Sequence, residues 1–297
     1  GRSASGGYYG VIDITVSNVT ISGFEVDGNY ASNSYNNDGI AMGWSGGDIS
    51  GITINNCVVH NTGLPHGGWG YGIIVTNYTQ HTTRNVVLTN NTVYDTQKGN
   101  IFLYASWTSA NNVVDTVLVR NNTVYNGGTG PNIEVCNDIR NATIEFNNIH
   151  DSISGYSGLN VRTSSDPGVA RGKPTNLIIR YNLIYNSSSK GIDFWPNYYA
   201  QDITADVYGN VLWGNGSGNT TCDGASINIS NTSGYPSWGN SVLNFYNNTI
   251  YDTNSGCTNS RYGISLGVWG TSLSGTPTIT FKNNIIYTGN FTAFYDG

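Results

Sequence analysis

The sequence predicts an all-β repeat protein in which one chain winds into stacked coils. Three observations support this prediction. Short runs rich in Val and Ile alternate with polar turns across all 297 residues, without helical periodicity. A short pattern centred on Asn recurs along the chain, and each copy is followed by a second short strand. A single coil of this kind cannot bury its apolar face, so stacking of the coils must form the core.

The first part of each repeat carries a column of Asn residues. Typical copies are VLTNNTVYD from Val87 and LVRNNTVYN from Leu118. Successive copies lie 25 to 38 residues apart and predict about nine coils. Side-chain amides at one phase of the coil can hydrogen-bond along the column. The aligned positions are Asn91, Asn122, Asn147, Asn182, Asn210, Asn248 and Asn284, with Phe24 and Cys57 at this position in two earlier copies.

A second column follows three residues after the first and is mostly aromatic. Its members are Asp27, His60, Tyr94, Tyr125, His150, Tyr185, Trp213, Tyr251 and Tyr287. Rings at one phase of the coil predict stacking, and His60 and His150 are therefore interpreted as structural. Paired Asn residues also occur in hairpin turns, but nine copies at nearly constant phase argue against hairpins.

The second strand of each repeat alternates between apolar and mixed positions. Positions such as Ile133 and Val135 are apolar in every copy and should face the core. The positions between them should point outward, and we expect them to be exposed. One outward column is Ala41, Ile74, Phe102, Glu134, Asn160, Asp193, Asn228 and Ser265. The other is Gly43, Thr76, Tyr104, Cys136, Arg162, Trp195, Ser230 and Gly267.

These repeats and columns resemble the right-handed parallel β-helix superfamily, the fold of pectate lyases, polygalacturonases and many surface proteins. The resemblance covers Val11 to about Tyr295. It implies one domain over residues 1–297, a single-stranded right-handed parallel β-helix with Asn and aromatic ladders. The resemblance does not predict one function, because proteins with this fold include lyases, glycosidases, epimerases, adhesins and phage spikes. An antiparallel sandwich would leave the two phased columns unexplained.

A cluster of polar and aromatic residues at coils three to six is the candidate site. Glu134 and Asp193 lie two rungs apart, about 9.6 Å at the usual strand spacing. That spacing suits the acid and base of an inverting glycosidase. Alternatively, Arg162 neutralises a uronate carboxylate for a lyase or epimerase, or the three charges form only a surface ion network. The predicted catalytic residues are Glu134, Asp193 and Arg162, and the predicted substrate-binding residues are Phe102, Tyr104, Asn160, Trp195 and Tyr198.

A second charged column, Arg120, Glu145 and Arg180, occupies consecutive rungs on another strand. The charges alternate in sign along this column, so neighbouring side chains can form ion pairs that stabilise the stack. The motif NNDGI around Asp38 is similar to one polygalacturonase motif, but the other motifs of that family are missing. Its catalytic residues are therefore not carried over.

The amino-acid composition limits the classes of molecule that the protein is expected to bind. Only 10% of residues are charged, the net charge is −6 and the pI is near 5.0, which argues against nucleic acid and anionic membranes. No apolar run approaches the roughly 18 residues of a membrane span. The surface rich in Asn, Ser, Thr and Tyr suits a polysaccharide or glycan partner. No spacing indicates a zinc site; no cofactor is expected except calcium, which the resemblance leaves possible.

The remaining expectations concern cysteines and chain ends. Cys222 and Cys257 precede strands of adjacent coils and are predicted to form a disulfide in an oxidising, extracellular compartment. Cys57 should be a buried thiol. No capping helix precedes Val11, and the chain stops inside the expected ninth coil. The chain is therefore expected to be part of a longer protein, or to self-associate end to end as an adhesin, sheath or filament subunit.

Overall fold

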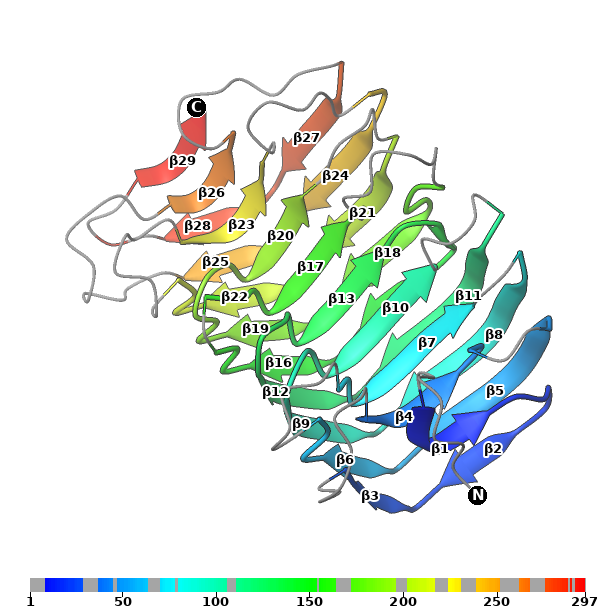
Figure 1. Cartoon of the computed structure of the whole chain (residues 1–297). Helices are drawn as coiled ribbons and strands as arrows, with labels where there is room; N and C mark the ends of the chain where they lie inside the picture. Colours follow the sequence, from blue (N-terminus) through cyan, green and yellow to red (C-terminus); the bar gives the residue numbers. More distant parts are fainter. Residues whose placement is uncertain are drawn as a thin grey trace.

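The protein is a parallel β-helix with three sheets (Figure 1). The computed structural model describes residues 9–28, 37–44, 47–63, 70–77, 80–105, 111–153, 155–163, 172–195, 202–216, 224–230, 239–251, 262–267, 276–287, 289 and 292–296. Every regular element within these residues is a β-strand. No part of this described chain forms a helix that is long and apolar enough to cross a membrane.

The strands of each sheet are paired in parallel, one coil after the next. Sheet A comprises β1 (Tyr9–Ile14), β4 (Asn37–Met42), β7 (Ile73–Asn77), β10 (Ile101–Ala105), β13 (Ile133–Cys136), β17 (Leu159–Arg162), β20 (Ile192–Trp195), β23 (Ala225–Ile229), β26 (Tyr262–Leu266) and β29 (Thr292–Asp296). Sheet B comprises β2 (Thr20–Ser22), β5 (Ile49–Asn55), β8 (Thr82–Thr89), β11 (Val113–Arg120), β15 (Thr143–Glu145), β18 (Leu177–Arg180), β21 (Thr204–Tyr208), β24 (Val242–Tyr246) and β27 (Thr278–Lys282), with β14 (Ile139–Arg140) beside β11. Sheet C comprises β3 (Glu25–Asp27), β6 (Val58–His60), β9 (Thr92–Thr96), β12 (Thr123–Gly127), β16 (Asn148–His150), β19 (Leu183–Tyr185), β22 (Val211–Trp213), β25 (Thr249–Tyr251) and β28 (Ile285–Tyr287).

The Asn-centred motif contains two strands joined by a sharp bend. In one copy β11 ends at Arg120, Asn121 has a φ of 55°, Asn122 follows, and β12 begins at Thr123. Asn and Gly adopt this left-handed conformation more readily than other residues, which explains the Asn-Asn pair. The chain thereby turns from sheet B into sheet C, and each coil has three strands.

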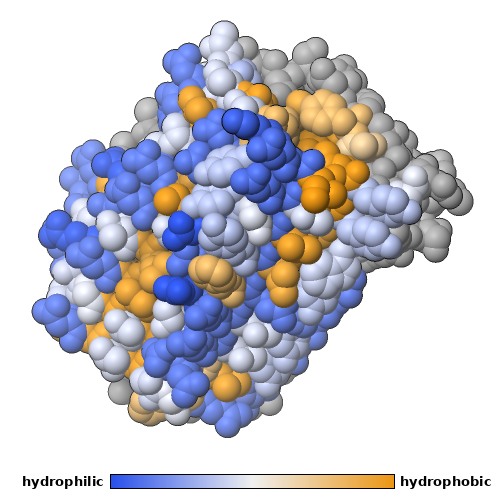
Figure 2. Space-filling model, turned by 180° about the vertical axis from the view of Figure 1, so that it is seen from behind, coloured by the Kyte–Doolittle hydropathy of each residue, from blue (hydrophilic) through white to orange (hydrophobic). Residues whose placement is uncertain are grey.

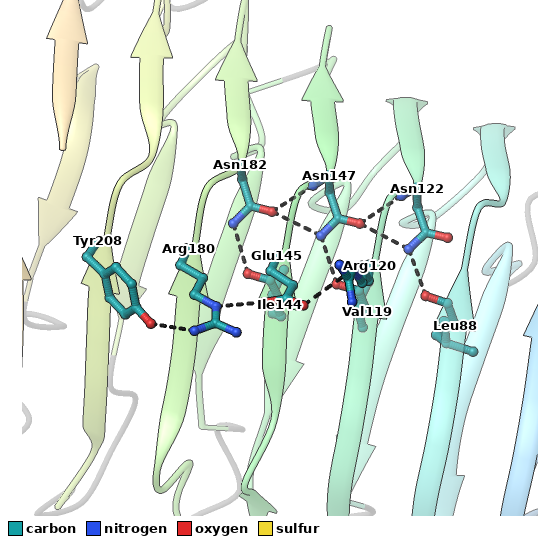
Figure 3. A network of polar contacts seen from close by, with 10 residues as sticks. All are labelled: Leu88, Val119, Arg120, Asn122, Ile144, Glu145, Asn147, Arg180, Asn182 and Tyr208. Atoms are coloured by element: carbon teal, nitrogen blue, oxygen red, sulfur yellow. Dashed lines mark hydrogen bonds and ion pairs between the residues drawn. The ribbon is translucent and has the colours of Figure 1, made fainter. Parts of the chain in front are cut away.

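The Asn ladder is confirmed and its members satisfy one another. Asn147 Nδ2 donates to the Val119 carbonyl at 2.9 Å and to Asn182 Oδ1 at 3.0 Å. Its own Oδ1 accepts from the backbone N–H of Asn122 at 2.9 Å and from Asn122 Nδ2 at 3.0 Å (Figure 3). One side chain therefore uses all four of its hydrogen-bonding positions at the bend.

The aromatic column is also confirmed, on the outer side of sheet C. Neighbouring rings lie nearly parallel from His60 to Trp213, with centroid distances of 4.1 to 5.1 Å. His60 and His150 are members of this stack, and both also contact carboxylates, Glu25 and Asp151 respectively. The stack accounts for both histidines structurally.

The core lies between the three sheets and is apolar. Every inward position of sheet A from β4 to β23 is nearly or fully buried, as Ile133 and Val135 show at 0% exposure. Phe194 of sheet A and Phe245 of sheet B meet edge to face within it, 5.7 Å apart. Cys57 is a buried free thiol, as predicted; its Sγ donates to the Ile21 carbonyl, a role that Asn Nδ2 has in later coils.

Candidate functional site

The outer face of sheet A brings the predicted catalytic residues together. In the pairing register, Phe102, Glu134, Asn160 and Asp193 occupy successive rungs of one column. Tyr104, Cys136, Arg162 and Trp195 occupy the same rungs of the neighbouring column, in the same order. Strands β10, β13, β17 and β20, which are neighbours in sheet A (Figure 1), thus carry all of these residues.

The expectation that this face is exposed is wrong for most of its residues. Glu134 is 3% exposed and Asp193 is 8% exposed. Phe102, Tyr104, Asn160 and Cys136 are likewise buried. Alternation along a strand gives the side of the sheet that a residue faces, but not whether solvent reaches that side. Here, rings and amides on adjacent rungs pack against one another. The solvent-accessible members are Arg162, whose side chain is 25% exposed, and Trp195, which is 37% exposed.

Glu134 and Arg162 form an ion pair within the buried face. Arg162 Nε donates to Glu134 Oε1, one rung along the sheet. Burial alone lowers the pKa of Arg162, but nearby Cys136, Glu134 and Tyr71 outweigh burial and raise the pKa above its ordinary value. A buried carboxylate would carry a large desolvation cost without such a partner, so Arg162 keeps Glu134 in place.

Asp193 is held by neutral donors. Its Oδ1 accepts from Asn228 Nδ2 at 2.7 Å. Its Oδ2 accepts from Asn160 Nδ2 at 3.3 Å and from Ser157 Oγ at 3.4 Å. The two carboxylates of this face therefore have different surroundings, one paired with a guanidinium and one with amides and a hydroxyl.

An aromatic cluster adjoins the ion pair on the N-terminal side. Tyr71 stacks on Phe102 with ring centroids 4.5 Å apart, and Phe102 stacks on Tyr104 at 4.8 Å. Burial, followed by the charge of Glu134, raises the pKa of Tyr71 well above its usual range, and Arg162 partly opposes this. The Tyr71 phenol is therefore protonated at neutral pH and lies within the electrostatic reach of the ion pair.

Asp38 is a second titratable group that sequence reasoning did not place here. It is 1% exposed, and Oδ1 accepts a hydrogen bond from the backbone N–H of Tyr71 at 2.8 Å. Burial raises the pKa of Asp38 to about 8, and the charge of Asp13 adds to the effect. Asp38 and Tyr71 lie two residues before the inward positions Ile40 and Ile73, so alternation would have assigned both to the core. Tyr71 nevertheless stacks on the outward ring of Phe102, and no alternation in the strands points to either residue.

Three predicted residues lie outside the described part of the chain, namely Tyr198, Cys222 and Cys257. Cys136, which was expected to point outward, has 0% exposure. The second charged column is confirmed as an ion network, with Arg180 Nε donating to Glu145 Oε2 at 2.6 Å (Figure 3). Within the described residues, no group of three or more His, Cys, Asp or Glu side chains could hold a metal ion.

The arrangement can support proton transfer beside a bound anion. Two carboxylates lie two rungs apart, a guanidinium reaches the surface between them in the neighbouring column, and a protonated phenol lies close by. Groups of this kind, gathered in a partly buried patch, are what acid–base chemistry requires.

Comparison with known proteins identifies the fold. No protein-family model matches the sequence, and neither does any curated protein. Among solved structures, the A-module of the mannuronan C-5 epimerase AlgE6 from Azotobacter vinelandii matches with a TM-score of 0.54 at 18% identity, over 96% of this chain and 77% of that one. The AlgE4 A-module of the same organism matches with a TM-score of 0.52 at 18% identity, over 97% and 79% of the two chains.

A phage protein matches similarly. The tailspike protein gp49 from Pseudomonas phage LKA1 has a TM-score of 0.53 at 12% identity, over 96% of this chain and 46% of that one. Identities this low establish the architecture and nothing finer. With the parallel register of its three sheets, they show that the protein has the parallel β-helix fold.

Proposed function

We propose that the protein is an extracellular, carbohydrate-active β-helix that binds and processes an acidic polysaccharide on the outer face of sheet A. One observation carries this proposal. Glu134 and Arg162 form a buried ion pair near the buried Asp193, which lies two rungs from Glu134 and one rung from Arg162. This face of sheet A reaches solvent at Arg162 and Trp195. Buried charges are costly to keep, and they are concentrated at functional sites more often than elsewhere.

Each residue has a role in this proposal. Arg162 keeps N–H donors beyond its bond to Glu134 and would bind a sugar carboxylate, while Trp195 offers a ring for stacking. Glu134 and Asp193, about 9.6 Å apart by strand spacing, would act as acid and base. Phe102, Tyr104, Asn160 and Tyr198 would shape the substrate site.

The comparisons support the proposal without deciding it. Two of the similar structures are modules of enzymes named for mannuronan, and the third is a phage tailspike. Both kinds of protein fit a glycan-directed role, and the tailspike fits an extracellular location. The low charge of the chain and its many neutral hydrogen-bonding side chains agree with a sugar partner.

A product assay tests the proposal. Purified protein is incubated with neutral and uronic polysaccharides, and absorbance of unsaturated products, new reducing ends and changes in uronate stereochemistry are recorded. Glu134→Gln and Asp193→Asn should each lower product formation by at least about a hundredfold. Ser265→Ala, in the same column on β26, is the matched control and should keep wild-type rates. Absence of product from the wild-type protein, or full activity in both variants, would exclude a catalytic role.

A structural surface role is the second candidate. Large apolar side chains are exposed on the last strands of the stack, including Ile285 at 65%, Tyr287 at 54% and Phe294 at 43%. Figure 2 shows apolar surface on the upper right of its view, on the C-terminal side of the stack. Such a surface could pair with another copy or domain. Electron microscopy of concentrated protein should then show end-to-end assemblies, and discrete particles at every concentration would count against this role.

A further inference from the structure

Two aromatic residues occupy positions of the coil that favour Asn or Gly. In each of the nine described bends between sheets B and C, the residue before the ladder position has a positive φ, between 53° and 74°. Seven of these residues are Asn or Gly: Gly23, Asn56, Asn90, Asn121, Gly209, Asn247 and Asn283. The other two are Phe146 and Tyr181, with φ values of 54° and 55°. They lie on adjacent coils, so both exceptions fall at one place.

This placement has a conformational cost. A bulky side chain at positive φ is strained, because its Cβ approaches the backbone carbonyl, whereas Asn tolerates the conformation. The ring of Tyr181 packs closely against Gly209 of the neighbouring coil, where a Cβ would lie 2.5 Å from Tyr181 Cδ1. Strain of this kind at one site of a repeat is a sign of function.

The two rings are exposed and stacked on each other. Each is 45% exposed, and their centroids lie 5.1 Å apart with an interplanar angle of 26°. Arg120 lies over the Phe146 ring, with its Cζ 5.3 Å from the centroid. Tyr181 meets Tyr208 edge to face at 5.5 Å, and Arg180 lies 5.8 Å from the centroids of both tyrosine rings. We call Arg120, Phe146, Arg180, Tyr181 and Tyr208 the sheet B platform.

The sheet B platform presents guanidinium groups and two half-exposed rings to solvent. Arg180 uses Nε for Glu145 and Nη1 for Tyr208 at 2.7 Å (Figure 3). Arg120 Nε lies 3.5 Å from Glu145 Oε1. Among the described residues, the Nη groups of Arg120 and Nη2 of Arg180 have no hydrogen-bond partner.

The column of Arg120, Glu145 and Arg180 carries a net positive charge within an acidic chain. Arg120 and Arg180 contribute two positive charges and Glu145 one negative charge, a sum of +1, within a chain of net charge −6. Asp206 is a further negative charge nearby, and it acts on Tyr246, which stacks on Tyr208. The side chain of Glu145 is 5% exposed, whereas those of Arg120 and Arg180 are 47% and 33% exposed. An approaching ligand therefore meets the guanidinium groups and the exposed rings rather than the carboxylate of Glu145.

We infer that the sheet B platform is a second glycan-binding site, which holds a carboxylate-bearing polysaccharide lying along the helix axis. Guanidinium groups bind carboxylates through paired N–H donors, and sugar rings pack against aromatic side chains. The two arginines lie two rungs apart, about 9.6 Å, so a polymer with a carboxylate on every residue can meet both. This site lies on sheet B, away from the catalytic face proposed on sheet A, and does not depend on that proposal.

Titration calorimetry tests the inference. It measures binding of the full chain to polygalacturonate at low ionic strength, with dextran as the neutral comparison. The double variant Phe146→Asn, Tyr181→Asn installs the residue type that other coils use at these bends. It should fold with an unchanged or higher melting temperature and bind at least about tenfold more weakly. Arg120→Gln leaves Glu145 paired with Arg180 and should weaken binding about fivefold.

Two matched controls remove similar groups elsewhere. Arg84→Gln removes an exposed arginine from β8 of the same sheet, and Tyr287→Asn removes an exposed ring from sheet C. Both should bind within about twofold of the wild type. No binding by the wild type would overturn the inference. So would equal losses in the controls, unchanged binding in the platform variants, equal affinity for dextran, or tighter binding of single-stranded nucleic acid. Product formation on sheet A plays no part in these outcomes.

Discussion

Single residues at the bends determine how well the coils are joined. The side chain of Asn147 makes four hydrogen bonds to three residues on the two neighbouring coils, and two of these bonds go to backbone groups, those of Val119 and Asn122. Removing it leaves the Asn122 backbone N–H and the Val119 carbonyl buried without this partner. Such groups lose the full free energy of their hydration when no replacement forms.

Asn147→Ala should therefore lower the free energy of unfolding by about 2–4 kcal/mol, the sum expected for two or more buried polar groups. The neighbouring Asn148 is the matched control. Its buried Oδ1 has no hydrogen-bond partner, so Asn148→Ala should change stability little. Urea unfolding followed by circular dichroism compares the two. Equal losses would show that the ladder bonds are not the stabilising contacts.

Asp38 should make stability depend on pH. Its pKa is about 8 in the folded protein, above the ordinary value of 3.8, so the folded state keeps a proton that the unfolded state releases. The contribution of this group is complete below about pH 3.8 and disappears progressively as pH rises to about 8. Asp38→Asn is neutral at every pH and can still accept from the Tyr71 N–H. Unfolding midpoints at pH 4, 6 and 8 should fall less steeply in this variant than in the wild type, and parallel slopes would contradict the assignment.

At the scale of elements, neighbouring strands create the pair of charges at the candidate site. Glu134 on β13 and Arg162 on β17 meet only because the two strands are in register. Breaking a buried pair from one side leaves an uncompensated charge, whereas removing both partners does not.

Arg162→Leu should consequently lower the free energy of unfolding by about 3–5 kcal/mol. The double variant Glu134→Gln, Arg162→Leu should recover most of that loss, because no charge stays buried. A double-mutant cycle in urea measures the coupling between the two sites. Additive effects would mean that the two side chains do not interact in solution.

Sequence patterns predicted which way strand residues point, but not how deeply they lie. The alternation placed Glu134, Asn160 and Asp193 on one outer face in the correct order, and the register confirms it. It failed on exposure, since packing between neighbouring rungs depends on side chains from several coils. Tyr71 and Asp38 were missed for a different reason. Both have the phase of inward residues, since they lie two positions before Ile73 and Ile40, yet Tyr71 packs against the outward ring of Phe102.

The whole molecule depends on one vertical register through three sheets. The sequence predicts this register well, because the Asn recurs in seven of the nine copies and the ring in eight. It does not predict that the Asn motif contains two strands, since the bend at residues such as Asn121 spans only two positions. Catalysis and ligand identity are set by a few side chains on a common scaffold, so the repeat pattern carries little information about them.

Disulfide trapping on sheet C tests the register most directly. Leu183 and Val211 are outward-facing partners on β19 and β22, and parallel neighbours lie about 4.8 Å apart, within the range that a disulfide bridges. Leu183→Cys with Val211→Cys should oxidise rapidly to a cross-link that mass spectrometry assigns. Leu183→Cys with Thr249→Cys spans two rungs, about 9.6 Å, and should not. A cross-link in the second pair but not in the first would contradict the stacking on which both proposed sites depend.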